Sequence, residues 1–344
     1  MAWEKLGSTS VGGSSDPVNN SWKELGRTTL GSAGDDITVS SFTAKDNLMI
    51  LCSTISTGNI DGALRFNTDT GSNYAIRRSE NGGSDATGTS QAKLILDRGH
   101  AAYPNNTFSV SNMNNISAQE KLVIGHSIAG VNGTGTAPDR TEMTGKWTNT
   151  SSQVTSVTCN NSDSGSWDTG SEVVVLGCDN DEADSGTNFW QELSSTVLTA
   201  THSGALTIPQ FTTKKYLMIR YYINASTDCI WRVGTGGSID SGTNQYYSRY
   251  SSNGASDSTL SYTSFLQHNP IIQGEVFIIN KSDKEKLMIQ HEVGQNTAGA
   301  GNIPNRREDV GKWINTSGQI DTLQYDKSGV SFYAGTTIKV YGAD

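Results

Sequence analysis

Residues 138–153 read PDRTEMTGKWTNTSSQ, and residues 304–319 read PNRREDVGKWINTSGQ. Ten of these sixteen paired positions carry the same residue, at a constant offset of 166. The similarity extends in both directions with small shifts in the offset, and the two copies end alike, at Gly177-Cys178-Asp179 and Gly342-Ala343-Asp344. Copies of about 155 residues are too long for a solenoid unit and have the size of whole domains. The sequence therefore predicts two homologous domains in tandem.

The ends of the repeat set the expected domain boundaries. We expect domain 1 at residues 22–179, domain 2 at residues 189–344, and a short acidic linker at residues 180–188 between them. Residues 1–21 form an N-terminal extension whose Trp, Leu, Gly and Thr repeat the spacing of the residues that open domain 1. The extension therefore predicts one additional strand, which pairs either with its own sheet or with the edge of a neighbouring subunit.

The composition favours short strands over helices. Only 17% of the residues are charged and 34% are hydrophobic, and much of the remainder is Ser, Thr, Asn and Gly, which are poor helix formers. Strand-length runs rich in branched apolar residues recur at 47–52, 121–125, 171–176 and 274–279. Asn-Gly pairs at 81–82 and 253–254 are typical of hairpin turns. We predict an all-β fold in which each copy is an antiparallel, jelly-roll-like β-sandwich.

Charge and motifs exclude several classes of partner. The net charge of −9 argues against binding to a nucleic-acid backbone or to an anionic membrane surface. No run of apolar residues is long enough to span a bilayer, and the N-terminus lacks the apolar run of a signal peptide. The spacing of the four cysteines matches no metal motif, and the chain contains no phosphate loop or dinucleotide fingerprint. We therefore expect no cofactor, no metal site and no membrane insertion.

Two equivalent groups of side chains are the candidates for a binding site. They are Arg140, Glu142 and Trp147 in the first copy, and Arg306, Glu308 and Trp313 in the second. An Arg and a Glu two positions apart on a strand point to the same face and can pair there. Our main interpretation is a structural ion pair above a buried Trp. The alternative is a glycan-binding patch, in which the indole stacks on a sugar while the Arg and Glu bind its hydroxyls. A buried Trp would exclude that patch.

His126 and His291 follow apolar strands at equivalent places in the two copies. We expect partly buried, hydrogen-bonded structural histidines, and the alternative is a ligand or acid–base role in each domain. The segment Gly125-His126-Ser127-Ile128-Ala129 departs from the nucleophile elbow Gly-x-Ser-x-Gly at its last position. The sequence gives no catalytic residue that a motif supports.

Three segments resemble a known group of proteins: LRFNTDTGSNY at 64–74, WKELGRTTLGSAGDDITV at 22–39, and GSEVVVLGCD at 170–179. They resemble β-sandwich modules of structural proteins of tailed phages, of a kind common in marine and cyanobacterial phages. Both copies carry the resemblance, although the second departs from the Phe-Asn turn of the first segment. The resemblance implies a non-enzymatic virion protein, assembled in the host cytoplasm and displayed as a capsid decoration or fibre, or built into the tail.

Three hypotheses follow. The first is an oligomeric virion structural protein, by analogy with spikes a trimer, whose partners are other virion proteins. The second is a carbohydrate-binding module that recognises glycans on the host surface. The third is a polysaccharide-degrading enzyme, which needs two carboxylates across a groove; its first candidates are Glu142, Glu308, Asp69 and Asp240. The size of the chain also matches a double-jelly-roll capsid protein, against which the similarity of the copies argues mildly.

Overall fold

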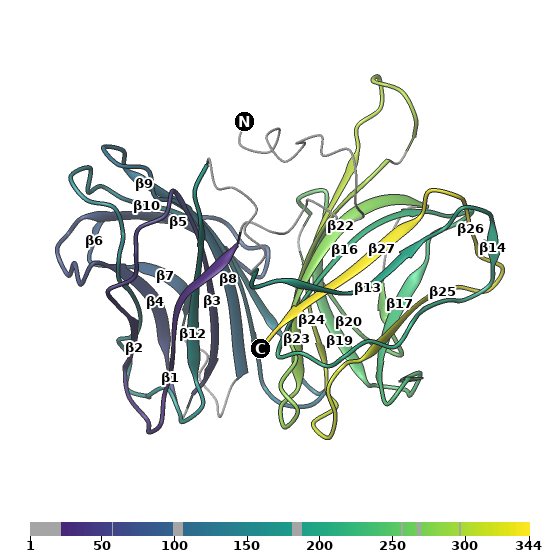
Figure 1. Ribbon diagram of the computed structural model, residues 1–344, viewed down its shortest axis with the longest axis horizontal. Coiled ribbons are helices and arrows are strands. Elements are labelled where there is room, and N and C mark those ends of the chain that lie inside the picture. The colour runs from purple at the N-terminus through teal and green to yellow at the C-terminus, as the bar shows by residue number, and fades with distance from the viewer. Residues whose placement is uncertain are drawn as a thin grey trace.

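The computed structural model describes residues 22–56, 58–98, 106–180, 188–255, 257–266, 270–295 and 297–344. Within these ranges the regular structure consists of β-strands, paired antiparallel into two large sheets, two smaller sheets and one two-stranded ladder (Figure 1). We call the strands from β1 to β12 the first sandwich and those from β13 to β27 the second sandwich. No helix in the described ranges is long and apolar enough to cross a membrane.

The first sandwich packs an eight-stranded sheet against a four-stranded one. The large sheet has the order β1 (Lys23–Thr29), β12 (Glu172–Cys178), β3 (Asn47–Ile55), β8 (Asn106–Asn114), β9 (Lys121–Gly130), β10 (Asp139–Trp147), β5 (Tyr74–Glu80) and β6 (Ala86–Gln91). The small sheet has the order β2 (Asp36–Val39), β11 (Val157–Asn161), β4 (Asp61–Phe66) and β7 (Leu94–Arg98).

The second sandwich has the same plan. Its large sheet has the order β13 (Gln191–Val197), β27 (Thr337–Ala343), β16 (Tyr216–Asn224), β22 (Ile271–Ile279), β23 (Lys286–Gly294), β24 (Asn305–Trp313), β19 (Tyr246–Ser252) and β20 (Ser258–Tyr262). Its small sheet has the order β15 (Leu206–Ile208), β25 (Thr322–Asp326), β17 (Ile230–Thr235) and β18 (Ser238–Ile239), and β21 (Phe265–Leu266) also pairs with β17. A separate short ladder joins β14 (His202–Ser203) to β26 (Ser331–Phe332).

Strands that the sequence repeat pairs with one another occupy the same place in the two large sheets. The register agrees as well, since His126 lies opposite Glu142 and His291 lies opposite Glu308. The prediction of an all-β fold of antiparallel sandwiches is confirmed. The domain boundaries stay predictions, and the N-terminal extension (1–21) and most of the acidic linker (181–187) lie outside the described residues.

The Asn-Gly pairs form hairpin turns as expected. Asn81 and Gly82 join β5 to β6 with φ angles of 51° and 68°, and Asn253 and Gly254 join β19 to β20 with φ angles of 55° and 75°. Two consecutive positive φ angles are what a type I′ turn requires, and Asn-Gly adopts them at little steric cost.

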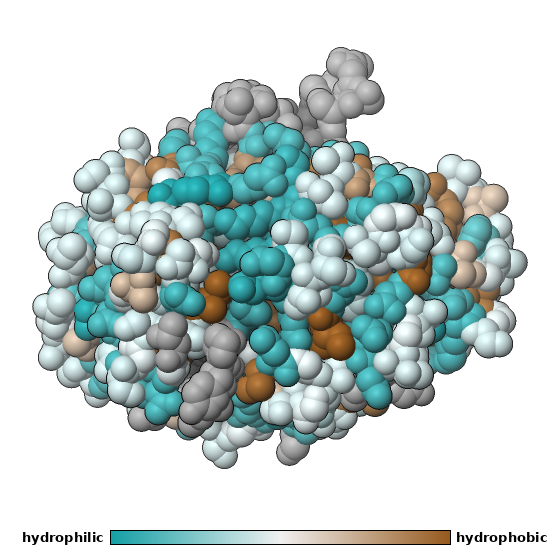
Figure 2. All heavy atoms as spheres, turned by 90° about the horizontal axis from the view of Figure 1, so that it is seen from below, coloured by the Kyte–Doolittle hydropathy of each residue, from teal (hydrophilic) through white to brown (hydrophobic). Residues whose placement is uncertain are grey.

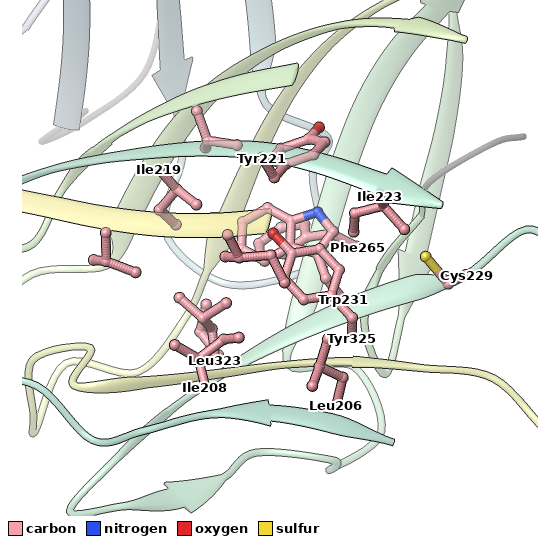
Figure 3. Packing of buried hydrophobic residues seen from close by; sticks show 14 of the residues in the cluster. Leu206, Ile208, Ile219, Tyr221, Ile223, Cys229, Trp231, Phe265, Leu323 and Tyr325 are labelled. Atoms are coloured by element: carbon pink, nitrogen blue, oxygen red, sulfur yellow. The ribbon is translucent and has the colours of Figure 1, made fainter. Parts of the chain in front are cut away.

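Each sandwich has its own core between its two sheets. In the second sandwich, Figure 3 shows Trp231 and Tyr325 of the small sheet meeting Tyr221 of the large one, with Phe265 alongside. In the first sandwich, residues such as Ile37 are fully buried in the equivalent core. Burial of one such large apolar side chain contributes about 1.5–3 kcal/mol to the free energy of folding. The core of each sandwich therefore holds its two sheets together.

A third apolar cluster joins the two sandwiches. It contains side chains from the outer faces of both large sheets, among them Leu51 and Val174 from the first and Leu287 and Ile289 from the second. Strands β8, β9 and β10 lie against β23 and β24. The layers therefore run small sheet, large sheet, large sheet, small sheet, and strands β3 and β12 are buried on both faces.

Double burial explains the unbroken apolar runs in the sequence. Along β12, Val173 and Val175 enter the core of the first sandwich, whereas Val174 and Leu176 enter the cluster between the sandwiches. A strand covered on one side only would alternate apolar and polar residues. The outer surface is different: Figure 2 shows a face that is mostly hydrophilic or neutral, with scattered apolar residues.

Candidate functional site

The two tryptophans of the candidate site are buried. Trp147 and Trp313 are each 1% exposed and point into the sandwich cores. Their indole nitrogens donate hydrogen bonds to carboxylates: Trp147 Nε1 lies 2.7 Å from Asp69 Oδ2, and Trp313 Nε1 lies 2.9 Å from Asp240 Oδ2. Neither indole face is available to stack on a sugar, and the glycan patch thus loses its aromatic platform.

Asp69 and Asp240 have the same structural task in the two copies. Each also accepts a backbone hydrogen bond two residues on, from Gly71 and from Gly242. Burial acts to raise the pKa of Asp69, but hydrogen bonds from Trp147 and other neighbours outweigh it and hold the pKa below its usual value. The turn keeps this geometry in the second copy although its sequence differs there.

The ion pair does not lie above the tryptophan. Arg140 and Glu142 occupy one face of β10, and Trp147 occupies the other, because successive side chains on a strand alternate. Arg140 and Glu142 do form a salt bridge, as expected. Their face of β10 meets the second sandwich. This corrects the expected position of the pair relative to the indole.

Arg140 is the centre of an ionic network between the sandwiches. Its side chain is 5% exposed, and Nη2 lies 2.6 Å from Oδ1 of Asp257, a residue of the second sandwich that is 2% exposed. Its Nη1 contacts both Glu142 and, at 3.3 Å, Oε2 of Glu308. Removing one partner from such a buried ion-pair network lowers stability strongly, because a buried charge then remains without compensation. Arg306, the equivalent of Arg140, is 62% exposed and pairs with Glu308 at 3.3 Å.

The structure thus separates the six candidate residues. Three of them, Arg140, Glu142 and Glu308, come together between the sandwiches. Asp257 completes the network, and the sequence reasoning missed it. The only signal was that Asp85 stands at the equivalent position of the first copy, where it forms an exposed pair with Arg77 instead.

Glu142 and Glu308 lie close enough to share a hydrogen bond. Burial is the largest influence on Glu142, and together with the neighbouring Glu308 it raises the pKa of Glu142 to about 7. Burial also acts to raise the pKa of Glu308, but the hydrogen bond from Glu142 and the charges of Arg306 and Arg140 lower it. Two adjacent carboxyl groups that share one proton avoid the repulsion between two negative charges.

His126 and His291 face each other beside this network. Their ring centroids are 4.1 Å apart, with the rings tilted by 60°. Burial lowers the pKa of His126 well below its usual value, and the charges of His291 and Arg140 lower it further. Burial lowers the pKa of His291 to about 4, even though the carboxylate of Glu308 acts in the opposite direction. Both rings are therefore neutral near pH 7, as suits two histidines packed in an interface.

A loop of the first sandwich extends the interface. Residues 131–138, which follow β9, lie against the second sandwich. The amide of Gly133 donates to Glu285, Lys312 donates to the carbonyl of Val131, and Arg249 Nε lies 2.6 Å from the carbonyl oxygen of Pro138. The sequence offered no motif for these contacts.

A second ionic cluster lies elsewhere in the interface. Glu172 on β12 is 2% exposed, and it accepts hydrogen bonds from Lys215 Nζ at 2.7 Å and from the hydroxyl of Tyr216 at 2.6 Å, both in the second sandwich. Burial acts to raise the pKa of Glu172, but these donors outweigh it and hold the pKa low. The carboxylate thereby ties β12 to the second sandwich.

Comparisons with known proteins do not identify the chain, since no family model matches it and no curated protein is significantly similar to it. Within the described residues, no group of three or more His, Cys, Asp and Glu side chains is arranged to hold a metal ion. The arrangement of charges described above is suited chemically to joining two sheets.

Proposed function

We propose that the chain is a non-enzymatic structural protein of a bacteriophage particle. In this proposal it assembles in the host cytoplasm, contacts other virion proteins and is displayed on the particle as a capsid decoration, a fibre or a tail component. The resemblance of three sequence segments to phage β-sandwich modules supports the proposal. The burial of residues from both copies between the two sandwiches also supports it.

The observation that carries the proposal is the apolar cluster between the large sheets. Residues of both copies, such as Leu51 and Ile289, are buried there against each other rather than lining a groove. The candidate carboxylates are also engaged: Glu142 and Glu308 bind Arg140, and Asp69 and Asp240 hold the tryptophans. The candidate residues thus stabilise the structure, which is what we expect of a protein with a structural role in an assembly.

Immunogold electron microscopy on purified particles that encode this chain tests the proposal. Antibodies raised against the full chain are expected to label the particles, and the label also locates the protein. Label over the head supports a decoration or capsid role, and label on the tail supports a tail or fibre role. Absence of label, with antibodies that bind the purified chain, would contradict the proposal. The trimer expected by analogy is tested separately by light scattering of the purified chain.

A further inference from the structure

The chain contains three Asn-Gly dipeptides, and two of them form the hairpin turns described above. The third, Asn132-Gly133, lies in the loop at 131–138, which packs against the second sandwich. The backbone nitrogen after an asparagine can attack the side-chain amide, and glycine hinders this approach least because it has no side chain. The attack converts asparagine to aspartate or isoaspartate. Each Asn-Gly is therefore a candidate site of covalent modification.

The two asparagines in the hairpin turns are held at both ends of the side-chain amide. Oδ1 of Asn81 accepts a hydrogen bond from the backbone nitrogen of Arg140 at 2.9 Å, and Nδ2 donates to Oδ1 of Asp139 at 2.7 Å. Oδ1 of Asn253 likewise accepts from the backbone nitrogen of Arg306 at 2.8 Å, and its Nδ2 donates to a second side chain at 3.0 Å. Either side chain must break both hydrogen bonds, and its turn must open, before it can react.

Asn132 is not held in this way. Its side chain is exposed and forms no hydrogen bond in the part of the chain that the structure describes. The space around the following glycine differs as well. A Cβ atom added to Gly133 would meet no atom within 4 Å, whereas one added to Gly82 would lie 2.4 Å from Oδ1 of Asp257. Gly133 therefore lies in open space, and Gly82 is packed against the second sandwich.

The interface between the sandwiches restrains the third dipeptide in a different manner. The amide of Gly133 donates its proton to Glu285, which is 5% exposed, and the carbonyl of Val131 accepts from Lys312. The attacking nitrogen is thus engaged while the loop packs on the second sandwich, and it becomes available when the loop lifts. A reaction of a transiently opened segment follows the opening equilibrium when reclosing is fast. The stability of the interface therefore controls the reaction at this position.

We propose that Asn132 is the residue at which the folded chain deamidates, at a rate set by opening of the interface between the sandwiches. The backbone nitrogen of Gly133 forms a bond to Cγ of Asn132, and the bond from Cγ to Nδ2 breaks. The side-chain nitrogen leaves as ammonia and takes up the proton that the Gly133 amide loses. Water then opens the resulting succinimide at either carbonyl, which leaves aspartate or isoaspartate.

The product weakens the contacts that held the loop. The new carboxylate stands beside the amide that binds Glu285, so two negative charges are brought close together. Isoaspartate also lengthens the backbone by a methylene group before Gly133, which displaces that amide. We therefore expect each conversion to loosen the interface irreversibly. The inference does not depend on the virion role proposed above, and its failure would leave the labelling of particles unaffected.

Incubation of the full chain at mildly alkaline pH, followed by tryptic digestion and mass spectrometry, tests the site. Tryptic peptide 122–140 contains Asn132 as its only asparagine, and peptide 79–93 contains Asn81 as its only one. In the folded chain we expect Asn132 to convert at least about tenfold faster than Asn81 and Asn253. In denaturant the three should convert at similar rates, because the restraints are gone. Equal rates in the folded chain, or the same order in denaturant, would overturn the proposal.

Two variants test the link to the interface. Leu287→Ala loosens the interface and should raise the rate at Asn132 by about threefold or more, whereas Leu122→Ala, at the exposed equivalent position, should leave it unchanged. Asn132→Gln removes the site, so after incubation it should keep the unfolding temperature that the unmodified chain loses. An unchanged rate in Leu287→Ala, or an equal loss of unfolding temperature in Asn132→Gln, would also overturn the proposal.

Discussion

Strands β9 and β23 are equivalent in the repeat, yet their outer faces have different environments. On β9, Leu122 and Ile124 are 57% and 55% exposed, whereas their equivalents on β23, Leu287 and Ile289, are each 1% exposed. The loop at 131–138 lies against the second sandwich near Leu287. In the equivalent loop of the second copy, Ile303 is 84% exposed. Equivalent apolar positions in the two copies are therefore buried or exposed according to which segment packs against them.

The largest expected difference concerns these leucines. Leu287→Ala should lower the free energy of unfolding by about 2–5 kcal/mol, because it opens a cavity in the cluster between the sandwiches. Leu122→Ala, its matched control on an exposed position, should change it by about 0.5 kcal/mol or less. Urea unfolding of both variants measures the difference. Equal losses would show that the two strands are packed alike.

The acidic residues Asp257 and Asp85 sharpen the same comparison. Asp257→Asn removes a buried partner of Arg140 and should lower the free energy of unfolding by about 2 kcal/mol or more, since Glu142 and Glu308 compensate only part of the charge. Asp85→Asn breaks an exposed pair with Arg77 and should cost about 1 kcal/mol at most. Thermal unfolding of the two variants at low and high salt tests this. A larger loss for Asp85→Asn would contradict the network.

The facing histidines predict a dependence of stability on pH. His291 has a pKa of about 4 when folded and about 6.5 when unfolded, and the pKa of His126 is lowered in the same direction. The folded chain therefore binds fewer protons in this window, and the free energy of unfolding should fall as the pH drops from about 6.5 to about 4. Arg140, Arg306, Glu142 and Glu308 surround the pair.

Replacing both His126 and His291 with Gln should flatten this part of the profile by on the order of 1 kcal/mol. His202→Gln, outside the interface, serves as the control and should leave the profile unchanged. Denaturant unfolding at a series of pH values gives the comparison. A double variant that loses stability on acidification as steeply as the unmodified chain would rule out the histidines as the source.

The smallest expected effect has the opposite sign. Glu142 has a raised pKa of about 7, so the folded chain holds a proton that the unfolded chain has released. Its contribution to stability is complete below the unfolded pKa and is lost as the pH rises through about 7. Glu142→Gln should therefore reduce the fall in stability between pH 6 and 8. The pKa of Glu308 itself is lowered, so the same measurements with Glu308→Gln should show a different profile. Identical profiles for the two variants would contradict the assignment of the shared proton.

Much of the fold was predictable because its signals are local. Branched apolar runs, Asn-Gly turns and the repeat predicted two antiparallel sandwiches. The strand order is the same in the two large sheets. One prediction, the ion pair above the tryptophan, could have been corrected from the sequence alone. Side chains alternate along β10, so residues 140 and 142 cannot share a face with residue 147. The unbroken run Val173–Leu176 could have indicated a strand buried on both faces.

The composition of the interface was not predictable in this way. Arg140 binds Asp257, more than a hundred positions away in the sequence, and Lys312 donates to the carbonyl of Val131. Both contacts form only when the two sandwiches pack together. No spacing in the sequence encodes such pairs.

Scanning calorimetry of the full chain tests most directly whether the two sandwiches form one cooperative unit through their large sheets. With an interface of buried apolar side chains and a buried ionic network, we expect a single transition whose calorimetric and van't Hoff enthalpies agree. In Leu287→Ala the transition should broaden or divide. Two separate transitions in the unmodified chain, each unaffected by substitutions in the interface, would contradict the account.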